Sequence, residues 1–190
     1  NALPAQLLLA DKQNDLAILK AKFTPDHVFP LSSERPQLMA DIFVAGYPFG
    51  KKFSTSITVT KGIISRLTGL QNNLAQIQID AAIQSGNSGG PIIDELGNIV
   101  GVAVAKLDYK VPLEKFGSIP ENINFGIKAS IVSGLLDSVG VTGNTANNKR
   151  ISNSELGKQV QKGTFYIACG MTMAQIKKMK TEKVMFSDFD

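Results

Sequence analysis

The sequence predicts an all-β fold on the basis of three observations. Short runs rich in Val, Ile, Phe and Thr alternate with clusters of turn-forming residues along most of the chain. Stretches with the 3.6-residue period of an amphipathic helix are rare before residue 128. The chain has 190 residues, 43% of them hydrophobic, which is enough to bury a core without disulfides or metals. The spacing of the apolar runs is typical of a β-sandwich or a β-barrel.

Eight apolar runs are expected to be strands. They lie at residues 6–9, 16–20, 42–46, 56–67, 75–79, 91–94, 99–105 and 124–127. Gly97 and Asn98 stand between the sixth and seventh runs and predict a hairpin turn. After the last strand, Ser130 is expected to cap a short closing helix that ends at Gly140.

The last part of the chain is expected to form a separate tail. Residues 142–149 are small and polar and predict a linker, so we expect a domain over 1–140, a linker over 141–150 and a basic tail over 151–190. Within this small α/β tail, residues 165–169 are predicted to be a strand that buries Cys169. Thr172 and Gln175 predict the start of a helix. About forty residues rarely fold alone, so the tail is expected to pack on the body, on a partner, or on nothing.

The charge distribution and the apolar runs argue against several classes of function. The net charge is +4, but residues 1–148 carry equal numbers of basic and acidic side chains, so the excess lies in the tail. A neutral body argues against a nucleic-acid-binding domain, and no nucleic-acid partner is expected. No apolar run approaches the roughly 18 residues needed to cross a bilayer, so no membrane span is expected. The tail lysines are interpreted as a solvated face, with an adaptor that binds anionic surfaces as an alternative.

The motif most indicative of chemistry is Gly-Asn-Ser-Gly-Gly-Pro at residues 86–91. A serine flanked by glycines suits a nucleophile, because glycine lets the backbone turn sharply and point two amides toward a substrate carbonyl. Gly86 and Ser88 are the candidate donors of such an oxyanion hole. The alternative is an ordinary hairpin loop, since Gly, Asn and Ser are common turn residues.

A second motif places an acidic residue at the entrance of a predicted strand. Asp15 precedes the run Leu-Ala-Ile-Leu-Lys. A catalytic triad needs a carboxylate that holds the tautomer of a histidine and stabilises the imidazolium form. Taken alone, Asp15 would be read as a turn residue at the start of a strand, and it gains weight only together with the serine motif.

At these positions the chain resembles the chymotrypsin-fold serine endopeptidases, and within them the bacterial HtrA-like (Deg-type) branch. The resemblance covers roughly residues 6–139. It rests on five ordered motifs: the Asp-x-x-x-Asp-Leu-Ala-x-Leu run containing Asp15, Gly-Tyr-Pro-Phe-Gly at 46–50, Thr-Val-Thr-Lys-Gly-Ile-Ile-Ser at 58–65, the Asp-Ala-Ala-Ile-x-x-Gly-Asn-Ser-Gly-Gly-Pro run containing Ser88, and Asn-Ile-Asn-Phe-Gly-Ile at 122–127. It implies a double β-barrel with a closing C-terminal helix, and hydrolysis of peptide bonds in proteins without a cofactor.

The resemblance also implies roles for individual residues. Ser88 would be the nucleophile, Asp15 the triad acid, and the amides of Gly86 and Ser88 the oxyanion hole. The substrate pocket would be walled by Ala82, Ile83, Ser85, Ala105 and Asn124. Ala82 stands where enzymes that cut after Lys or Arg carry an acid, which implies a small apolar pocket for aliphatic side chains. Asn87 replaces the aspartate that captures a freed N-terminal amine in digestive members, so that route of activation is expected to be absent.

The catalytic histidine of the family has no counterpart here. It lies in a Thr-Ala-x-His run some tens of residues before the triad acid, whereas the only histidine, His27, follows Asp15 and is expected to be a surface residue. Either the first part of the N-terminal barrel lies before Asn1 and the chain is a fragment of a peptidase, or the protein is an inert peptide-binding relative. Asn1 in place of Met and the retained Asp15 favour the first explanation.

The resemblance further implies partners and a location. It implies protein or peptide substrates and a place in the bacterial periplasm or cell envelope, and it leaves a homo-oligomer open. No metal site and no phosphate-binding loop is recognised in the sequence, so no metal and no cofactor is expected.

Overall fold

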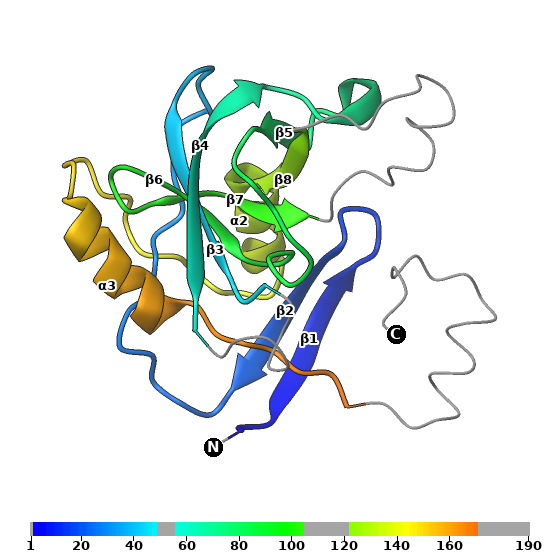
Figure 1. Cartoon of the computed structure of the whole chain (residues 1–190). Helices are drawn as coiled ribbons and strands as arrows, with labels where there is room; N and C mark the ends of the chain where they lie inside the picture. The colour runs from blue at the N-terminus through cyan, green and yellow to red at the C-terminus, as the bar shows by residue number, and fades with distance from the viewer. Residues whose placement is uncertain (1, 49–55, 105–121, 171–190) are drawn as a thin grey trace.

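The computed structural model describes residues 2–48, 56–104 and 122–170 of the chain (Figure 1). Strands account for most of the regular structure in these residues. In chain order the elements are β1 (Ala5–Asp11), β2 (Leu16–Ala21), β3 (Asp41–Gly46), β4 (Thr58–Arg66), a 3₁₀ turn (Leu70–Asn72), β5 (Gln76–Ile79), β6 (Pro91–Asp94), β7 (Ile99–Val104), β8 (Asn124–Lys128), α2 (Ala129–Ser138) and α3 (Asn153–Gly163). The predicted all-β fold is therefore confirmed, and each of the eight predicted strands overlaps an observed one.

Six strands close into an antiparallel barrel in the order β3-β4-β5-β8-β7-β6, with β6 pairing back on β3. Isoleucines dominate its interior, because branched side chains fill the pleated inner surface well. The fully buried members of this core include Ile42, Ile64, Ile77, Ile79 and Ile92. The hairpin between β6 and β7 turns as predicted: the Asp94 carboxylate accepts the Asn98 N–H at 2.8 Å, and Gly97 has a φ of 82°.

The remaining two strands, β1 and β2, form a separate antiparallel hairpin beside the barrel (Figure 1). Of the two barrels expected, the described chain thus contains one closed barrel and this two-stranded sheet. Leu7 and Leu19, which pair across the hairpin, are 56% and 40% exposed. The hairpin buries little apolar surface within the described residues, so its contribution to the core is small.

Helix α2 follows β8 without a loop. The sequence led us to expect Ser130 as its cap, and this was wrong. The last residue of β8, Lys128, is the N-cap, and Ser130 lies in the first helical turn without a capping bond. The helix ends at Ser138, two residues before the predicted end, and Gly140 follows the C-cap Val139. Gly140 has a φ of 71°, and the Val141 N–H donates to the Leu136 carbonyl at 3.0 Å, which satisfies a carbonyl that the helix leaves open.

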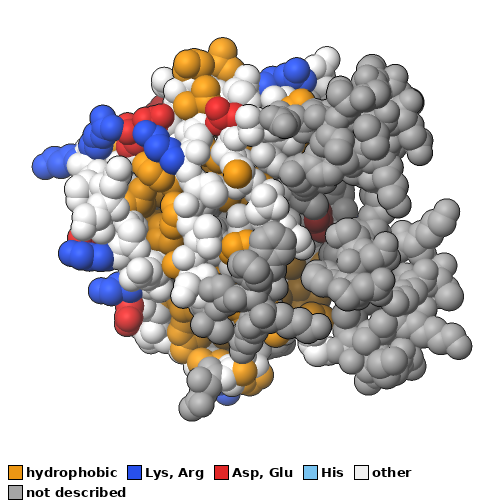
Figure 2. Space-filling view, in the orientation of Figure 1, with side chains coloured by type: hydrophobic (Ala, Val, Ile, Leu, Met, Phe, Trp, Pro, Cys, Tyr) orange, Lys and Arg blue, Asp and Glu red, His pale blue; other side chains and the backbone are white. Residues whose placement is uncertain are grey.

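Helix α3 is the main element that the sequence analysis missed. The hydroxyl of Ser152 accepts the N–H of Glu155 at 3.2 Å and begins the helix. Leu156 and Val160, four residues apart, are buried against the outer face of the barrel. Charged side chains, including lysines, lie on the outward side of this helix, and the space-filling view shows Lys and Arg gathered in this region (Figure 2). The Ser-x-x-Glu capping pattern at 152–155 was present in the sequence and indicates this helix.

The barrel accommodates α3 because β3 is buried on both faces. Ile42 and Val44 point into the barrel, whereas Phe43 and Ala45 point outward and pack with Leu156 of α3 and its neighbours. This is why the run at 42–45 is continuously apolar rather than alternating. Helix α3 therefore extends the barrel's hydrophobic contacts.

The residues around α3 differ from the expected tail. Residues 165–169 form no strand, and Cys169 is exposed, because no neighbouring strand pairs with this segment in the described chain. The helix expected from Thr172 lies outside the described residues. Residues 141–148 have no regular structure, as a linker would. They are nevertheless tied to the barrel, since the Asn147 N–H donates to the Asn98 Oδ1 at 2.7 Å. The division into domains stays a prediction.

Neither α2 nor α3 has the length and apolar character of a membrane-spanning helix, and no other described helix does.

Candidate active site

Ser88 lies in the loop between β5 and β6, which consists of two consecutive turns. The N–H of Asn87 donates to the carbonyl of Gln84 at 2.9 Å, and the N–H of Gly90 donates to the carbonyl of Asn87 at 2.9 Å. The third residue of the first turn is Gly86, with a φ of 100°, and the third residue of the second is a glycine with a φ of 82°. Positive φ at this position is the mark of a type II turn and favours glycine. The glycines of the motif thus shape the loop around Ser88.

Three hydrogen bonds hold the start of this loop to neighbouring strands. The Asp80 carboxylate accepts the N–H of Ile63 in β4 at 2.6 Å. The side-chain amide of Asn124, at the start of β8, donates to the Ala81 carbonyl at 2.9 Å. The hydroxyl of Thr60 donates to the Ala82 carbonyl at 2.8 Å. Side chains from two strands therefore fix the path of the backbone before it reaches Ser88.

The end of the loop is fixed by close backbone packing. The Gly89 N–H donates to the Ala103 carbonyl in β7 at 2.7 Å, and the Ala103 N–H donates back to the Gly90 carbonyl at 2.9 Å. A Cβ on Gly90 would collide with the carbonyl oxygen of Ala45 in β3. Only glycine allows the loop to approach β3 this closely.

Among the described residues, the bonding pattern of the loop leaves several amides without an acceptor, those of Gly86 and Ser88 among them. Asn87, Gly89 and Gly90 all donate their N–H groups to carbonyls. Among the described residues, the N–H groups of Gly86 and Ser88 donate to no acceptor. Both residues are exposed, and Ser88 forms no side-chain hydrogen bond to any described residue. The loop therefore offers an accessible hydroxyl together with two backbone donors that have no partner in the part of the chain that the structure describes.

The residues expected to wall a substrate pocket fall into different environments. Ala82 and Ser85 are exposed beside the loop. Ile83 is 2% exposed and packs in the barrel core. Asn124 is 3% exposed and holds the loop as described above, and its Oδ1 has no hydrogen-bond partner. Ala105 lies outside the described residues.

Asp15 is the last residue of the turn that joins β1 to β2. It is exposed and has a φ of 54°. The turn is ordered by Asp11, whose carboxylate accepts from the backbone N–H groups of Gln13 and Asn14 and from the Asn14 side chain at 2.7 Å. These bonds, the one from the Asn14 side chain above all, lower the pKa of Asp11. Asp15 and Ser88 thus come from different sheets, and no hydrogen bond joins them in the described chain.

His27 lies away from this loop, against the end of α3. The expectation of a surface residue holds only in part: His27 is partly exposed, but its Nε2 is buried and has no hydrogen-bond partner among the described residues. Its ring meets that of Phe29 edge to face at 4.5 Å, and a Cβ on Gly163 would lie 3.2 Å from its Cδ2. Packing between a phenylalanine and a helix end leaves its imidazole no contact with Ser88.

The partly buried position of His27 predicts a pH-dependent stability. Burial lowers the pKa of His27, with a smaller opposing effect from Glu155 and a further lowering by Lys162, both on α3. The folded protein therefore binds the proton less well than the unfolded chain, whose histidine has a pKa of about 6.5. The resulting stabilisation is present above about pH 6.5 and is lost as the pH falls through the lower pKa of the folded state. Thermal unfolding of wild type and His27→Gln between about pH 5 and 8 checks this. The wild type is expected to lose more stability on acidification, and parallel curves would contradict the prediction.

Comparison with known proteins agrees with the barrel and identifies the family. A family model described as a trypsin-like peptidase domain matches residues 1–102. The chain is 32% identical over 141 residues to the serine endoprotease DegS of Escherichia coli, which covers 70% of this chain and 37% of that protein. It is 33% identical over 168 residues to the uncharacterized protein y4bJ of Sinorhizobium fredii, covering 88% of this chain and 26% of that one. The chain thus spans 26% to 37% of the length of these relatives.

Solved structures give the same relationship. The serine endoprotease from Yersinia pestis matches with a TM-score of 0.57 and 30% identity, over 72% of this chain and 44% of that one. The Rv3671c protease, in an inactive form, matches with a TM-score of 0.55 and 26% identity, over 73% and 68% of the two chains. From its sequence motifs, its barrel and these matches, the chain belongs to the trypsin-like peptidase family and is homologous to the HtrA-type serine proteases.

Proposed function

We propose that this chain carries the nucleophile, the acid and the oxyanion hole of a serine endopeptidase. The observation that supports this most is the loop at 84–90, where an exposed Ser88 lies beside the unpaired amides of Gly86 and Ser88. The Ser88 Oγ attacks the carbonyl carbon of a peptide bond, and the developing oxyanion accepts hydrogen bonds from the two amides. The C–N bond then breaks, the serine proton passes through a base to the leaving amine, and water hydrolyses the acyl-enzyme.

In this proposal the base is a histidine from outside the 190 residues. His27 is unsuited to the role, since its Nε2 is shielded by Phe29 and the end of α3. Asp15 is the proposed acid that orients the base. Its position at the end of an exposed turn leaves the carboxylate accessible to a partner residue.

The proposed substrate is a protein or peptide with a small aliphatic side chain at the cleavage site. Ala82 and Ser85 are small, uncharged and exposed beside Ser88, which supports an apolar pocket without a counter-ion for Lys or Arg. In this proposal Ile83 does not contact the substrate and supports the loop by packing in the barrel core. Periplasm or cell envelope is the proposed location, by analogy with the HtrA-type relatives.

Active-site labelling tests the proposal. The native protein, expressed from its own gene, is incubated with a fluorophosphonate, which phosphonylates only an activated serine, and the adduct is mapped by peptide mass spectrometry. We expect a single adduct on the peptide containing Ser88, with a rate that rises with pH as the base loses its proton. No adduct, or an adduct on another serine, would overturn the proposal. Peptide binding without any adduct would instead identify an inert peptide-binding module.

A further inference from the structure

Tyr47 connects the serine loop to the chain that follows α3. It stands directly after the last residue of β3, and its backbone N–H donates to the carbonyl of Gly86 at 3.4 Å. Its hydroxyl donates to the carbonyl of Thr164 at 3.1 Å, across 117 positions of sequence. Its ring meets that of Tyr166 edge to face at 5.8 Å. One residue thus contacts both the proposed oxyanion hole and the C-terminal segment.

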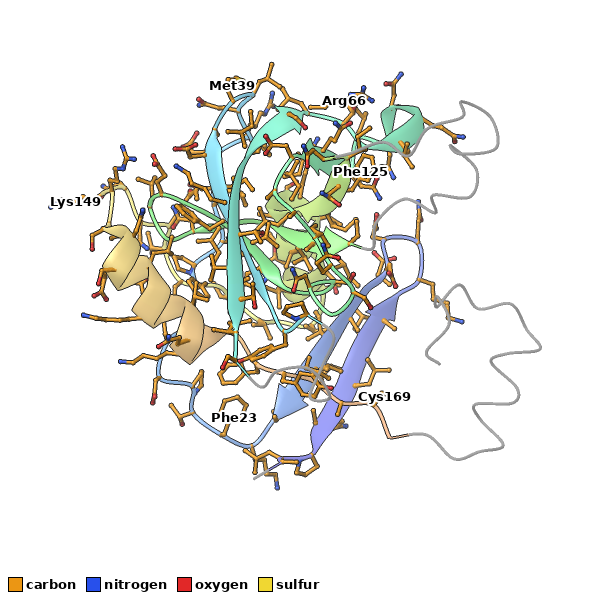
Figure 3. All side chains as sticks on the ribbon, viewed as in Figure 1. Phe23, Met39, Arg66, Phe125, Lys149 and Cys169 are labelled. Carbon is orange, nitrogen blue, oxygen red and sulfur yellow. The ribbon has the colours of Figure 1, made fainter. Side chains whose placement is uncertain are left out.

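The segment concerned, residues 164–167, is here called the α3 strap. Thr164 is 8% exposed and fixes its start, whereas Phe165, Tyr166 and Ile167 are 49%, 41% and 67% exposed. On the side of the hairpin, Phe165 meets Phe23 edge to face at 5.0 Å, and the stick view labels Phe23 near the end of β2 (Figure 3). The strap is therefore held by aromatic and hydrogen-bond contacts on both sides, without deep burial beyond Thr164.

The contact of Tyr47 with Gly86 matters because glycine does not hold its own orientation. Gly86 has no Cβ and a φ of 100°, so its two adjoining peptide planes can rotate at little steric cost. The peptide unit between Gly86 and Asn87 is held by two bonds: the Asn87 N–H donates to the Gln84 carbonyl within the turn, and the Gly86 carbonyl accepts the Tyr47 N–H from outside the loop. Loss of the Tyr47 bond would leave this unit held by the turn alone, so the neighbouring amides could shift relative to a substrate.

We infer that Tyr47 is a positioning residue for the proposed peptidase site: its hydroxyl bond to the α3 strap restrains the backbone that holds the Gly86 carbonyl. This inference rests on the proposed function. Tyr47 makes both bonds, one through its hydroxyl to Thr164 and one through its backbone N–H to Gly86. Holding its side chain therefore also restrains its backbone. The docked α3 strap therefore helps to orient the amides of Gly86 and Ser88. Undocking of the strap lowers turnover, although the residues that touch the substrate stay the same.

Tyr47→Phe tests the inference in the native protein, because it removes the hydroxyl and keeps the ring. We expect kcat for a peptide substrate to fall about three- to tenfold, the range for loss of one hydrogen bond, with KM within about twofold. Amide hydrogen exchange over residues 84–90 is expected to speed up by a similar factor. Phe165→Ala, which loosens the strap from the other side, is expected to change kcat and exchange in the same direction.

The matched control is Ser138→Ala, which removes another hydroxyl bonded to a backbone carbonyl, that of Leu135 in α2. It is expected to change neither kcat nor exchange in the loop. If Tyr47→Phe lowers only the melting temperature, or leaves kcat and loop exchange at wild-type values while the wild type turns over, the inference is overturned and the proposed function stands. If the wild type itself neither cleaves peptide nor forms the Ser88 adduct, the proposed function fails first, and the role of Tyr47 in it fails too.

Discussion

Ser88→Ala in the native protein is expected to lower kcat/KM for peptide hydrolysis by about 10³- to 10⁶-fold, because removal of the Oγ eliminates the acyl-enzyme route. Residual turnover would come from substrate binding and the two backbone amides, which the substitution leaves in place. The folded state should be unaffected. Ser88 is exposed and its hydroxyl has no partner among the described residues, so the free energy of unfolding should change by less than about 0.5 kcal/mol.

The matched control for this substitution is Ser130→Ala. Ser130 is also exposed, lies in the first turn of α2 and caps nothing, so both activity and stability should stay near wild type. Steady-state kinetics and thermal unfolding of the three proteins check the prediction together. Activity of Ser88→Ala within about tenfold of wild type would contradict the role of Ser88. A parallel loss of activity and stability would indicate that the serine shapes the loop rather than attacking the substrate.

The strands and the serine loop could be predicted because local sequence determines them. β6 was predicted at its observed bounds, since Pro91 starts it and the Gly97 turn follows it. The motif at 86–91 likewise indicated a loop that only glycines can form. Which amides of that loop stay unpaired depends in part on the carbonyl of Ala103, which accepts the Gly89 N–H from another part of the chain. The sequence suggested Gly86 and Ser88 through the glycines that flank the serine, and the family resemblance supported the same two residues.

Contacts between distant segments account for what the sequence did not reveal. α3 has two buried positions, Leu156 and Val160, on a helix that is otherwise polar, so few apolar residues mark it in the sequence. Its existence follows from the outward-facing Phe43 and Ala45, which need a cover. The position of His27 under the end of α3 depends on the same docking and could not be inferred without it. A helix that is stabilised mainly by packing against a distant part of the chain is poorly predicted from its own residues.

Gly90→Ala is expected to have the largest effect of any methyl addition in the serine loop. The new Cβ would meet the carbonyl oxygen of Ala45. That carbonyl cannot yield easily, because β3 is hydrogen-bonded to β4 and β6 and is buried on both faces. The loop must move instead, and the two bonds between the loop and Ala103 would be strained or lost. Overpacking and weakened hydrogen bonds together predict a destabilisation of about 2 to 5 kcal/mol.

Activity should fall with the same substitution, since a displacement of about 1 Å at reacting groups costs on the order of 100-fold in rate. Alanine substitutions at two further glycines serve as controls, because they add a methyl group without the collision with Ala45. Gly89 has a φ of 82° but open space around it, so Gly89→Ala should cost only the backbone strain, about 1 kcal/mol. Gly134 lies inside α2 with nothing within 4 Å of an added Cβ, so Gly134→Ala should stabilise by about 0.5 to 1 kcal/mol.

We therefore expect an order of stability in thermal or denaturant unfolding of the three variants. Gly134→Ala should be more stable than wild type, Gly89→Ala less stable, and Gly90→Ala the least stable. The first comparison checks that a methyl group is tolerated where space and φ allow it. The second isolates the strain of positive φ at the loop. The third adds the collision with β3. If Gly90→Ala is as stable as Gly89→Ala and retains wild-type turnover, the loop does not depend on its close approach to Ala45, and the barrel cannot be what holds Ser88 in position.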